Sequence, residues 1–132
     1  MARGGLEAYG ALVLRVVLGA IYVAHAYLAL VVMGLGEAIQ YQRSYHIPLP
    51  EIGAWYLIVA HGLGGILLIL GVMVRWAALA NIPIMAVALW FVHLKQGFFV
   101  LNGQSGYEYV LVMLGATIAQ ALLGAGAFTL KR

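Results

Sequence analysis

The chain has 132 residues, which is enough for one domain. Hydrophobic residues make up 65% of it and charged residues only 8%, so water cannot surround it as it surrounds a soluble domain, which carries about 25% charged residues. The seven lysines and arginines form no basic cluster, which excludes a nucleic-acid partner, and the absence of cysteine excludes disulfides, zinc thiolates and thiol redox chemistry.

Four long apolar segments predict four transmembrane helices, because about 20 residues span a hydrocarbon core of roughly 30 Å. The segments cover residues 9–33, 54–73, 76–94 and 107–126. Only Val74 and Arg75 separate the second segment from the third, and so short a connection makes two helices an antiparallel hairpin. The sequence therefore predicts an all-α integral membrane protein with a single domain, an antiparallel bundle of four transmembrane helices.

The first apolar segment also has features of a cleavable signal peptide. Arg3 precedes it, and Ala24, His25 and Ala26 resemble a cleavage site flanked by small residues. However, the apolar run continues well past that site, whereas the apolar region of a signal peptide is about 7–15 residues long. We therefore expect the first segment to be a retained membrane helix.

Positively charged residues predict the orientation, because the cytoplasmic loops of membrane proteins carry an excess of lysine and arginine. If both termini are cytoplasmic, the residues on the inner side are Arg3, Arg75, Lys131 and Arg132, and those on the outer side are Arg43 and Lys95. We therefore expect both termini in the cytoplasm.

The first outer connection, residues 34–53, is the longest. Within it, residues 37–42 predict a short interfacial helix that ends before Pro48, since a helix usually stops ahead of a proline.

Each predicted helix places one titratable side chain in its outer half. Ionisable groups inside a membrane are costly and usually face the bundle interior, so each one marks a candidate site. A structural explanation remains open, because a membrane histidine often only bonds a neighbouring helix, for about 0.6 kcal/mol, and an ion pair near the interface is ordinary. The four side chains are His25, His61, His93 and Glu108.

The inner half carries Arg15, Asn81 and Gln120. Arg15 lies close enough to the membrane edge to extend towards it, and it could bond helix termini or bind a lipid phosphate. Asn81 is a candidate partner for the backbone carbonyl that Pro83 leaves free. The sequence thus predicts a structural or lipid-binding role for this inner set.

Three blocks of the sequence and its closing segment resemble the DoxX family of bacterial and archaeal membrane proteins. The first block is residues 14–19 followed by His25, and the second is residues 64–71 followed by 75–79. The third and most distinctive block runs from Val92 through His93 to Phe99, continues with Asn102 and Gly103, and ends with residues 106–109. The closing segment is residues 122–126.

The chain also departs from the family pattern. The family commonly has a glycine where Ala26 follows the first histidine, a lysine shortly after it, and a proline at the position of Ala125. A glutamate is common just before the glycines of the second helix, where this chain has His61. An imidazole in place of an acid changes the charge of a buried site.

The resemblance implies a protein of the prokaryotic cytoplasmic (inner) membrane. Relatives include membrane subunits similar to those of thiosulfate:quinone oxidoreductase, and the common theme is electron transfer to the quinone pool. We therefore expect a membrane subunit of an oxidoreductase system that interacts with quinone and with a redox partner. Without a thiol or a recognised flavin motif, the chain is not expected to be catalytic alone.

The residue types suit a quinone, whose oxygens need hydrogen-bond partners and a proton route. We expect His25 and His61 to contact the carbonyl oxygens, and His93 with Glu108 to form the proton path. Trp55 or Trp90 would then form a wall against the quinone ring.

Two other functions remain open. The chain could be a non-enzymatic anchor or assembly subunit of a larger complex, with partner subunits or further copies of itself. Alternatively, His25, His61 and His93 could bind haem or a metal, since two opposed histidines can hold a haem between helices. No two of these histidines stand four residues apart on one helix, so the sequence predicts no preformed metal site.

Overall fold

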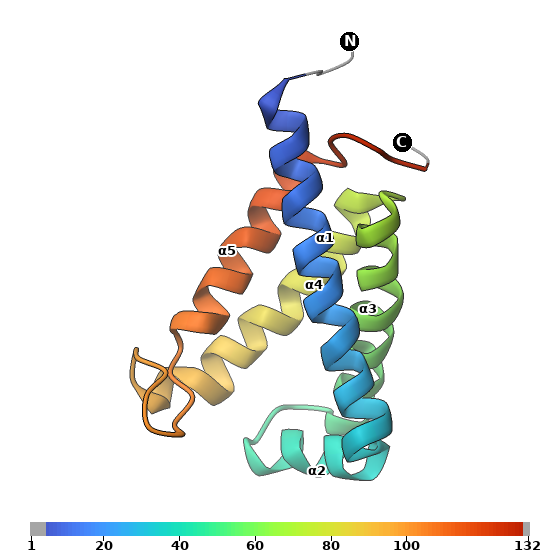
Figure 1. Cartoon of the computed structure of the whole chain (residues 1–132). Helices are drawn as coiled ribbons and strands as arrows, with labels where there is room; N and C mark the ends of the chain where they lie inside the picture. Colours follow the sequence, from blue (N-terminus) through green and yellow to red (C-terminus); the bar gives the residue numbers. More distant parts are fainter. Residues whose placement is uncertain (1–4, 131–132) are drawn as a thin grey trace.

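The computed structural model describes residues 5–130, and that part of the chain is helical apart from turns, loops and isolated β-bridge residues (Figure 1). Three helical stretches are long and apolar enough to cross a membrane, namely Leu6–Met33, Pro50–Leu70 and Val74–Gln96. A fourth apolar helix, α5 (Glu108–Leu123), is shorter. The predicted class, an all-α membrane protein, is confirmed.

Two of the long stretches change their winding towards one end. Helix α1 (Leu6–Tyr27) continues as a π-helix, Leu28–Met33. Helix α4 (Val74–Val87) continues as a second π-helix, Ala88–His93, and then as a single 3₁₀ turn, Leu94–Gln96. Both changes occur at the same end of the bundle, which we call the loop end because it carries α2 and the loop between the 3₁₀ turn and α5 (Figure 1).

Helix α2 (Leu35–Ser44) confirms the short helix predicted in the first long connection. Gly34, at φ 86°, turns the chain sharply away from α1, and α2 then lies across the loop end (Figure 1). Its buried residues are Ala38 and Gln42, and the Gln42 amide occupies the space that a side chain at Gly53 would need. Glycine at position 53 therefore lets α2 pack closely on α3.

Helix α3 (Pro50–Leu70) begins and ends earlier than hydropathy predicted. It begins at Pro50 because proline suits the first turn of a helix, although Glu51 lowers the local hydropathy. It ends because Gly71 adopts a left-handed conformation at φ 75°. The connection to α4 is thus residues 71–73, and Val74 and Arg75, predicted as the connection, belong to α4.

Helix α5 is shorter than the predicted segment 107–126. It ends at Leu123 because Gly124 has φ 80°, which continues no right-handed helix.

Glycines allow α3 to approach two neighbours at once. A Cβ atom on Gly19 of α1 would lie 2.5 Å from the carbonyl oxygen of Gly65, and one on Gly65 would lie 2.8 Å from the carbonyl oxygen of Gly19. A Cβ on the adjacent Gly64 would lie 2.8 Å from Nδ2 of Asn81 on α4. The backbones are therefore in contact, which is how helices associate in lipid without help from the hydrophobic effect.

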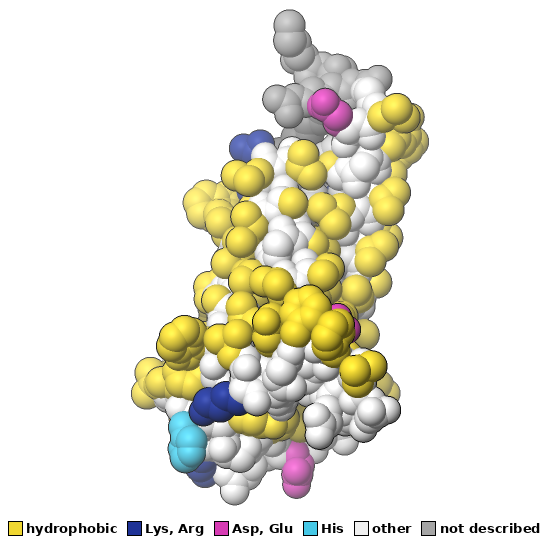
Figure 2. Space-filling model, turned by 90° about the vertical axis from the view of Figure 1, so that its left-hand side faces the viewer, with side chains coloured by type: hydrophobic (Ala, Val, Ile, Leu, Met, Phe, Trp, Pro, Cys, Tyr) yellow, Lys and Arg dark blue, Asp and Glu magenta, His cyan; other side chains and the backbone are white. Residues whose placement is uncertain are grey.

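The helices α1, α3, α4 and α5 share one core cluster, while other large apolar side chains face outwards. Leu18, Leu68, Ala78 and Met113 come one from each helix and are at most 4% exposed. Figure 2 shows hydrophobic side chains covering the middle of one face of the molecule, with charged side chains mainly near its two ends. Such a surface is suited to contact with the bilayer.

Helices α1 and α3 form one closely packed pair, and α4 and α5 form another (Figure 1). The pairs meet at the end where α1 begins and α5 ends, which we call the tail end, and they diverge towards the loop end. At the tail end, the backbone N–H groups of Ala127 and Leu130 donate to the carbonyl oxygens of Ala8 and Leu70. The segment after α5 is therefore folded back onto α1 and α3.

Three of the charges used to predict orientation, Arg3, Lys131 and Arg132, lie outside the described residues. Of the others, Arg75 lies at the tail end, whereas Arg43 and Lys95 lie at the loop end.

Candidate functional site

His61 lies in the middle of α3 and is held by Asn81 of α4. The side chains are 2% and 0% exposed, and Nδ1 of His61 is 2.6 Å from Oδ1 of Asn81. The amide nitrogen of Asn81 donates to the carbonyl oxygens of Ala60 and Ala77, both at 2.9 Å. Asn81 therefore bonds α3 and its own helix. The carbonyl that Pro83 leaves free belongs to Leu79, four residues earlier, and it is not among these partners, so the predicted role of Asn81 is wrong.

These contacts fix the tautomer of His61. Both amide hydrogens of Asn81 are committed to carbonyl oxygens, which only accept, so its Oδ1 faces His61 as an acceptor. Nδ1 of His61 must then donate. In a neutral imidazole the other nitrogen, Nε2, is an acceptor.

His25 of α1 has the same tautomer by the same logic. Its Nδ1 lies 2.9 Å from the carbonyl oxygen of Ile21, one helical turn earlier, and must donate to it. The ring centroids of His25 and His61 are 6.4 Å apart, at an interplanar angle of 81°. His61 is buried, whereas His25 is exposed on the membrane-facing surface. Among the described residues, neither Nε2 has a hydrogen-bond partner.

Tyr22 extends this cluster to α5. Its ring stacks on His61 with centroids 4.6 Å apart, and its hydroxyl bonds Oγ1 of Thr117. Because Thr117 donates its only hydrogen to the carbonyl oxygen of Met113, Tyr22 must be the donor in their bond. We define the polar cluster as Tyr22, His25, His61, Asn81 and Thr117. It joins α1, α3, α4 and α5.

The exposed ring of His25 stands beside the buried ring of His61. His61 itself is 2% exposed. A ligand carried in the bilayer would therefore meet His25 first. In the described part of the chain, Oε1 of Gln120 is a fully buried side-chain oxygen without a partner.

The other two predicted titratable residues lie elsewhere, at the loop end. Nδ1 of His93 is 3.2 Å from Oε1 of Gln96, and the Glu108 carboxylate accepts a hydrogen bond from the backbone N–H of Val100. In residues 5–130, no three histidine, aspartate or glutamate side chains gather closely enough to hold a metal ion. The structure thus brings His25 and His61 together and leaves His93 and Glu108 apart from them.

His61 lies deeper along its helix than the sequence predicted, and this separates it from His93 and Glu108 at the loop end. Because α3 begins at Pro50, His61 stands eleven residues along it, about 16 Å from its start at 1.5 Å per residue, and so near the middle of the span. The sequence-based start at residue 54 had placed it only about two turns inside.

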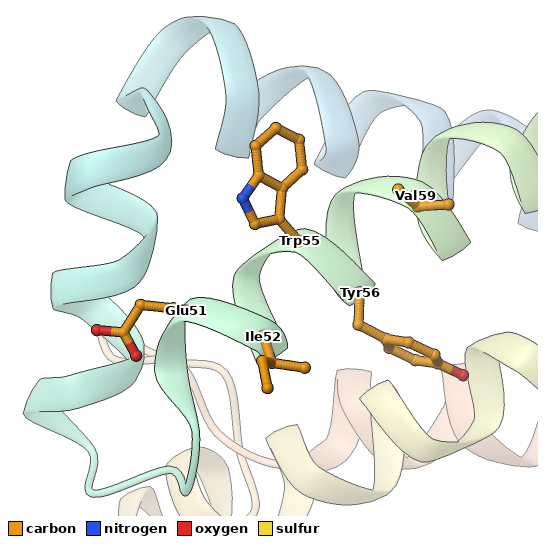
Figure 3. Close-up of a pocket in the computed structure, with 5 residues that line it drawn as sticks. All are labelled: Glu51, Ile52, Trp55, Tyr56 and Val59. Carbon is orange, nitrogen blue, oxygen red and sulfur yellow. The ribbon is translucent and has the colours of Figure 1, made fainter.

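The two tryptophans are not part of the polar cluster. Trp90 is 68% exposed. Trp55 is 51% exposed and lines an open pocket of about 480 Å³ on α3 (Figure 3). Its other lining residues are Glu51, Ile52, Tyr56 and Val59. In Figure 3, Tyr56 points towards α4, where its hydroxyl donates to the carbonyl oxygen of Ala80.

Arg15 has a different environment at the tail end. It is 1% exposed, and its five N–H groups all donate to backbone carbonyl oxygens. The acceptors are Leu68, Ile69, Ala125, Ala127 and Phe128. A guanidinium has five such hydrogens, so none is left for a lipid phosphate. Arg15 closes the end of α3 and fixes the segment after α5.

Gln120, the third residue of the predicted inner set, bonds the end of its own helix. It is 0% exposed, and its Nε2 donates to the carbonyl oxygen of Gly124 at 2.7 Å.

The two histidines lie where α1 and α3 pack closely. A Cβ atom on Gly62 of α3 would lie 3.4 Å from Cβ of Ala26 on α1, and these residues adjoin the two histidines. Haem binding by these histidines stays a prediction.

Sequence reasoning missed Tyr22, Thr117 and Gln42. Tyr22 could have been found, since a tyrosine in the middle of an apolar span needs a hydrogen-bond partner for its hydroxyl. It also stands one turn from His25 on the same helix face. Thr117 and Gln42 carry no such signal, because their partners are set by tertiary packing.

The model of one family, DoxX, matches residues 10–94. The matched range contains three members of the polar cluster that the sequence had singled out, His25, His61 and Asn81. It excludes most of the third block of resemblance and the closing segment. No curated protein and no solved structure matches the chain.

Proposed function

The chain belongs to the DoxX family, as its sequence predicted, and from this we propose that it is the membrane subunit of an oxidoreductase system that binds quinone. The observation that carries the proposal is the pair of unpartnered Nε2 atoms on His25 and His61, two histidines that lie side by side within the membrane helices. Polar atoms without a partner are costly in a membrane, and they usually mark a site for a ligand or a proton.

The proposal includes four membrane spans with both termini on the cytoplasmic side of an inner membrane. Helix α5 has 16 residues, about 24 Å at 1.5 Å per residue, which is somewhat less than a hydrocarbon core of about 30 Å. It packs along α4, and its buried Thr117 completes the polar cluster, so it belongs inside the same bundle. Arg75 at the tail end supports a cytoplasmic position for that end.

Each member of the polar cluster would have its own task. A quinone has a planar ring, two oxygens on the ring and an apolar tail suited to lipid. The exposed His25 would meet it at the bilayer surface of α1, and His61 would contact it more deeply. Asn81 holds the His61 ring in one orientation, and Tyr22 closes its other face.

Conversion between quinone and quinol requires two electrons and two protons. Since the chain has no cysteine, the electrons would pass to or from a partner subunit that carries a redox group. His93 and Glu108, which lie at the loop end, would serve only the aqueous end of a proton route, because they do not touch the polar cluster.

A second candidate is a non-enzymatic anchor or assembly subunit. It is favoured by the hydrogen bonds of Tyr22 with Thr117, of His61 with Asn81 and of Asn81 with the Ala60 carbonyl, which join different helices and would stabilise the bundle even without a ligand.

Binding of short-chain quinones separates the two candidates. The protein would be reconstituted in lipid nanodiscs, and equilibrium binding of decylubiquinone and of a menaquinone analogue would be measured, each in its oxidised and its reduced form. We expect one of them to bind, and His25→Leu to weaken the binding of its reduced form at least tenfold while the variant stays folded. His46→Asn, a change at an exposed histidine in a loop, is the matched control and should bind normally.

If neither quinone binds to the wild-type protein, while the protein still copurifies with a partner complex, the anchor function replaces the oxidoreductase one. Mass spectrometry of proteins and small molecules that copurify in mild detergent supplies that second result.

A further inference from the structure

Every hydrogen-bond donor of the polar cluster is already used within the protein. The hydroxyls of Tyr22 and Thr117 are committed to Thr117 and to a carbonyl oxygen, and both amide hydrogens of Asn81 go to carbonyl oxygens. The Nδ1 hydrogens of His25 and His61 are committed as well. The histidines can therefore offer a neutral ligand only acceptor lone pairs, one on each Nε2.

We propose that the His25–His61 site binds the reduced form of the quinone, the quinol, in preference to the oxidised form. This inference rests on the proposed function, because it concerns the ligand of the same site. A quinol has O–H groups that can donate to an Nε2 lone pair. A quinone has only carbonyl oxygens, which would face lone pairs, so the ligand and the imidazoles would both lack a donor.

The preference differs from the expectation drawn from the sequence, in which the histidines donate to quinone carbonyls. It arises because Asn81 and Ile21 hold the Nδ1 hydrogens in place. Sites whose polar groups must be matched by the ligand reject an analogue without the matching group more strongly than apolar pockets do. Asn81 is thus a positioning residue, which acts through His61.

Histidine tautomers can be measured directly. Protein with ¹⁵N-labelled histidine in nanodiscs gives nitrogen resonances from only four residues, and His25→Gln and His61→Gln assign two of them by loss. We expect both to carry hydrogen on Nδ1 and a bare Nε2 when neutral. An Nε2–H tautomer on His61 would overturn the proposal without any ligand or partner.

Ligand preference is the second measurement. Affinities for the reduced and oxidised forms of whichever quinone binds would be compared anaerobically in the same nanodiscs. We expect the quinol to bind about tenfold more tightly, which corresponds to roughly one hydrogen bond. His25→Gln brings an N–H₂ donor to an exposed position, so it should move the ratio towards one. His46→Asn should leave the ratio unchanged.

The outcomes are distinct for the two proposals. Equal affinities, or tighter binding of the quinone, would overturn the quinol preference and leave the proposed function intact. Binding of neither form would remove the proposed function and, with it, the preference.

Discussion

The crossing of α1 and α3 allows a sharp test of how this bundle is held together. In Gly65→Ala, the new Cβ would lie 2.8 Å from the carbonyl oxygen of Gly19 and 2.8 Å from a methyl carbon of Val23. These distances are about 0.6 Å short of an ordinary 3.4 Å contact. Because one of the obstacles is backbone, a side-chain rotation cannot relieve the overlap, and the helices must separate.

We expect Gly65→Ala to lower the free energy of unfolding by about 1–3 kcal/mol, the usual cost of overpacking a core. Gly115→Ala is the matched control, since Gly115 is exposed on α5 and a Cβ there meets nothing within 4 Å. The control should be neutral or up to about 1 kcal/mol more stable, because alanine is the better helix former. Reversible unfolding by SDS in mixed micelles measures both changes.

Gly19, the other glycine of this contact, provides a stricter test. Gly19→Ala alone should cost a similar amount, since its Cβ would lie 2.5 Å from the carbonyl oxygen of Gly65. Once one alanine has separated the helices, the second meets less resistance, so the double variant should lose less than the sum of the two. Additive losses, or a Gly65→Ala protein as stable as the control, would refute the proposed contact of backbones.

Three further predictions concern other parts of the chain. Arg15→Lys should destabilise the protein by about 3–6 kcal/mol, because a lysine has three donors for five carbonyls, so two charged hydrogen bonds are lost at about 1.5–3 kcal/mol each. Hydrogen exchange at the Ala127 amide should also become faster. Tyr22→Phe should cost about 1 kcal/mol in the same unfolding assay, since one bond to Thr117 is lost; an unchanged stability would contradict that bond. A reporter fused after Arg132 should be read as cytoplasmic, and a periplasmic signal would overturn the orientation.

The sequence predicted the helices better than it predicted their ends. Apolar length alone identified the long spans, because few residue types are tolerated in lipid. Their ends depend on local backbone geometry at Pro50, Gly71 and Gly124, to which hydropathy is insensitive. That is why the connection between α3 and α4 was placed three residues too late.

The candidate site was predicted in part for a related reason. His25 and His61 stand out in apolar segments, and the structure places them side by side. His93 and Glu108 were grouped with them by estimated depth, but equal depth does not imply contact in a bundle whose helix pairs diverge towards the loop end (Figure 1). Thr117 was missed because its partner, Tyr22, is 95 residues away in the sequence.

Asn81 also explains why position 61 requires a donor. The Asn81 amide cannot be turned round without losing its bonds to Ala60 and Ala77, so its Oδ1 always faces position 61. A glutamine there can donate an N–H to it, whereas an ionised glutamate would place an acceptor against an acceptor. His61→Gln should therefore cost less stability than His61→Glu, by about 1–3 kcal/mol, the penalty for leaving a buried polar group unsatisfied.

The pH dependence of stability gives a control for the comparison of His61→Glu with His61→Gln. A protonated carboxyl can donate to Asn81, so the folded His61→Glu variant favours the protonated form, and its stability should rise as the pH falls. His61→Gln has no titratable group at that position and should not share this rise. Unfolding of both variants across a range of pH measures the difference. Parallel pH profiles would show that Asn81 does not impose a donor on position 61, and the tautomer assigned to His61 would lose its basis.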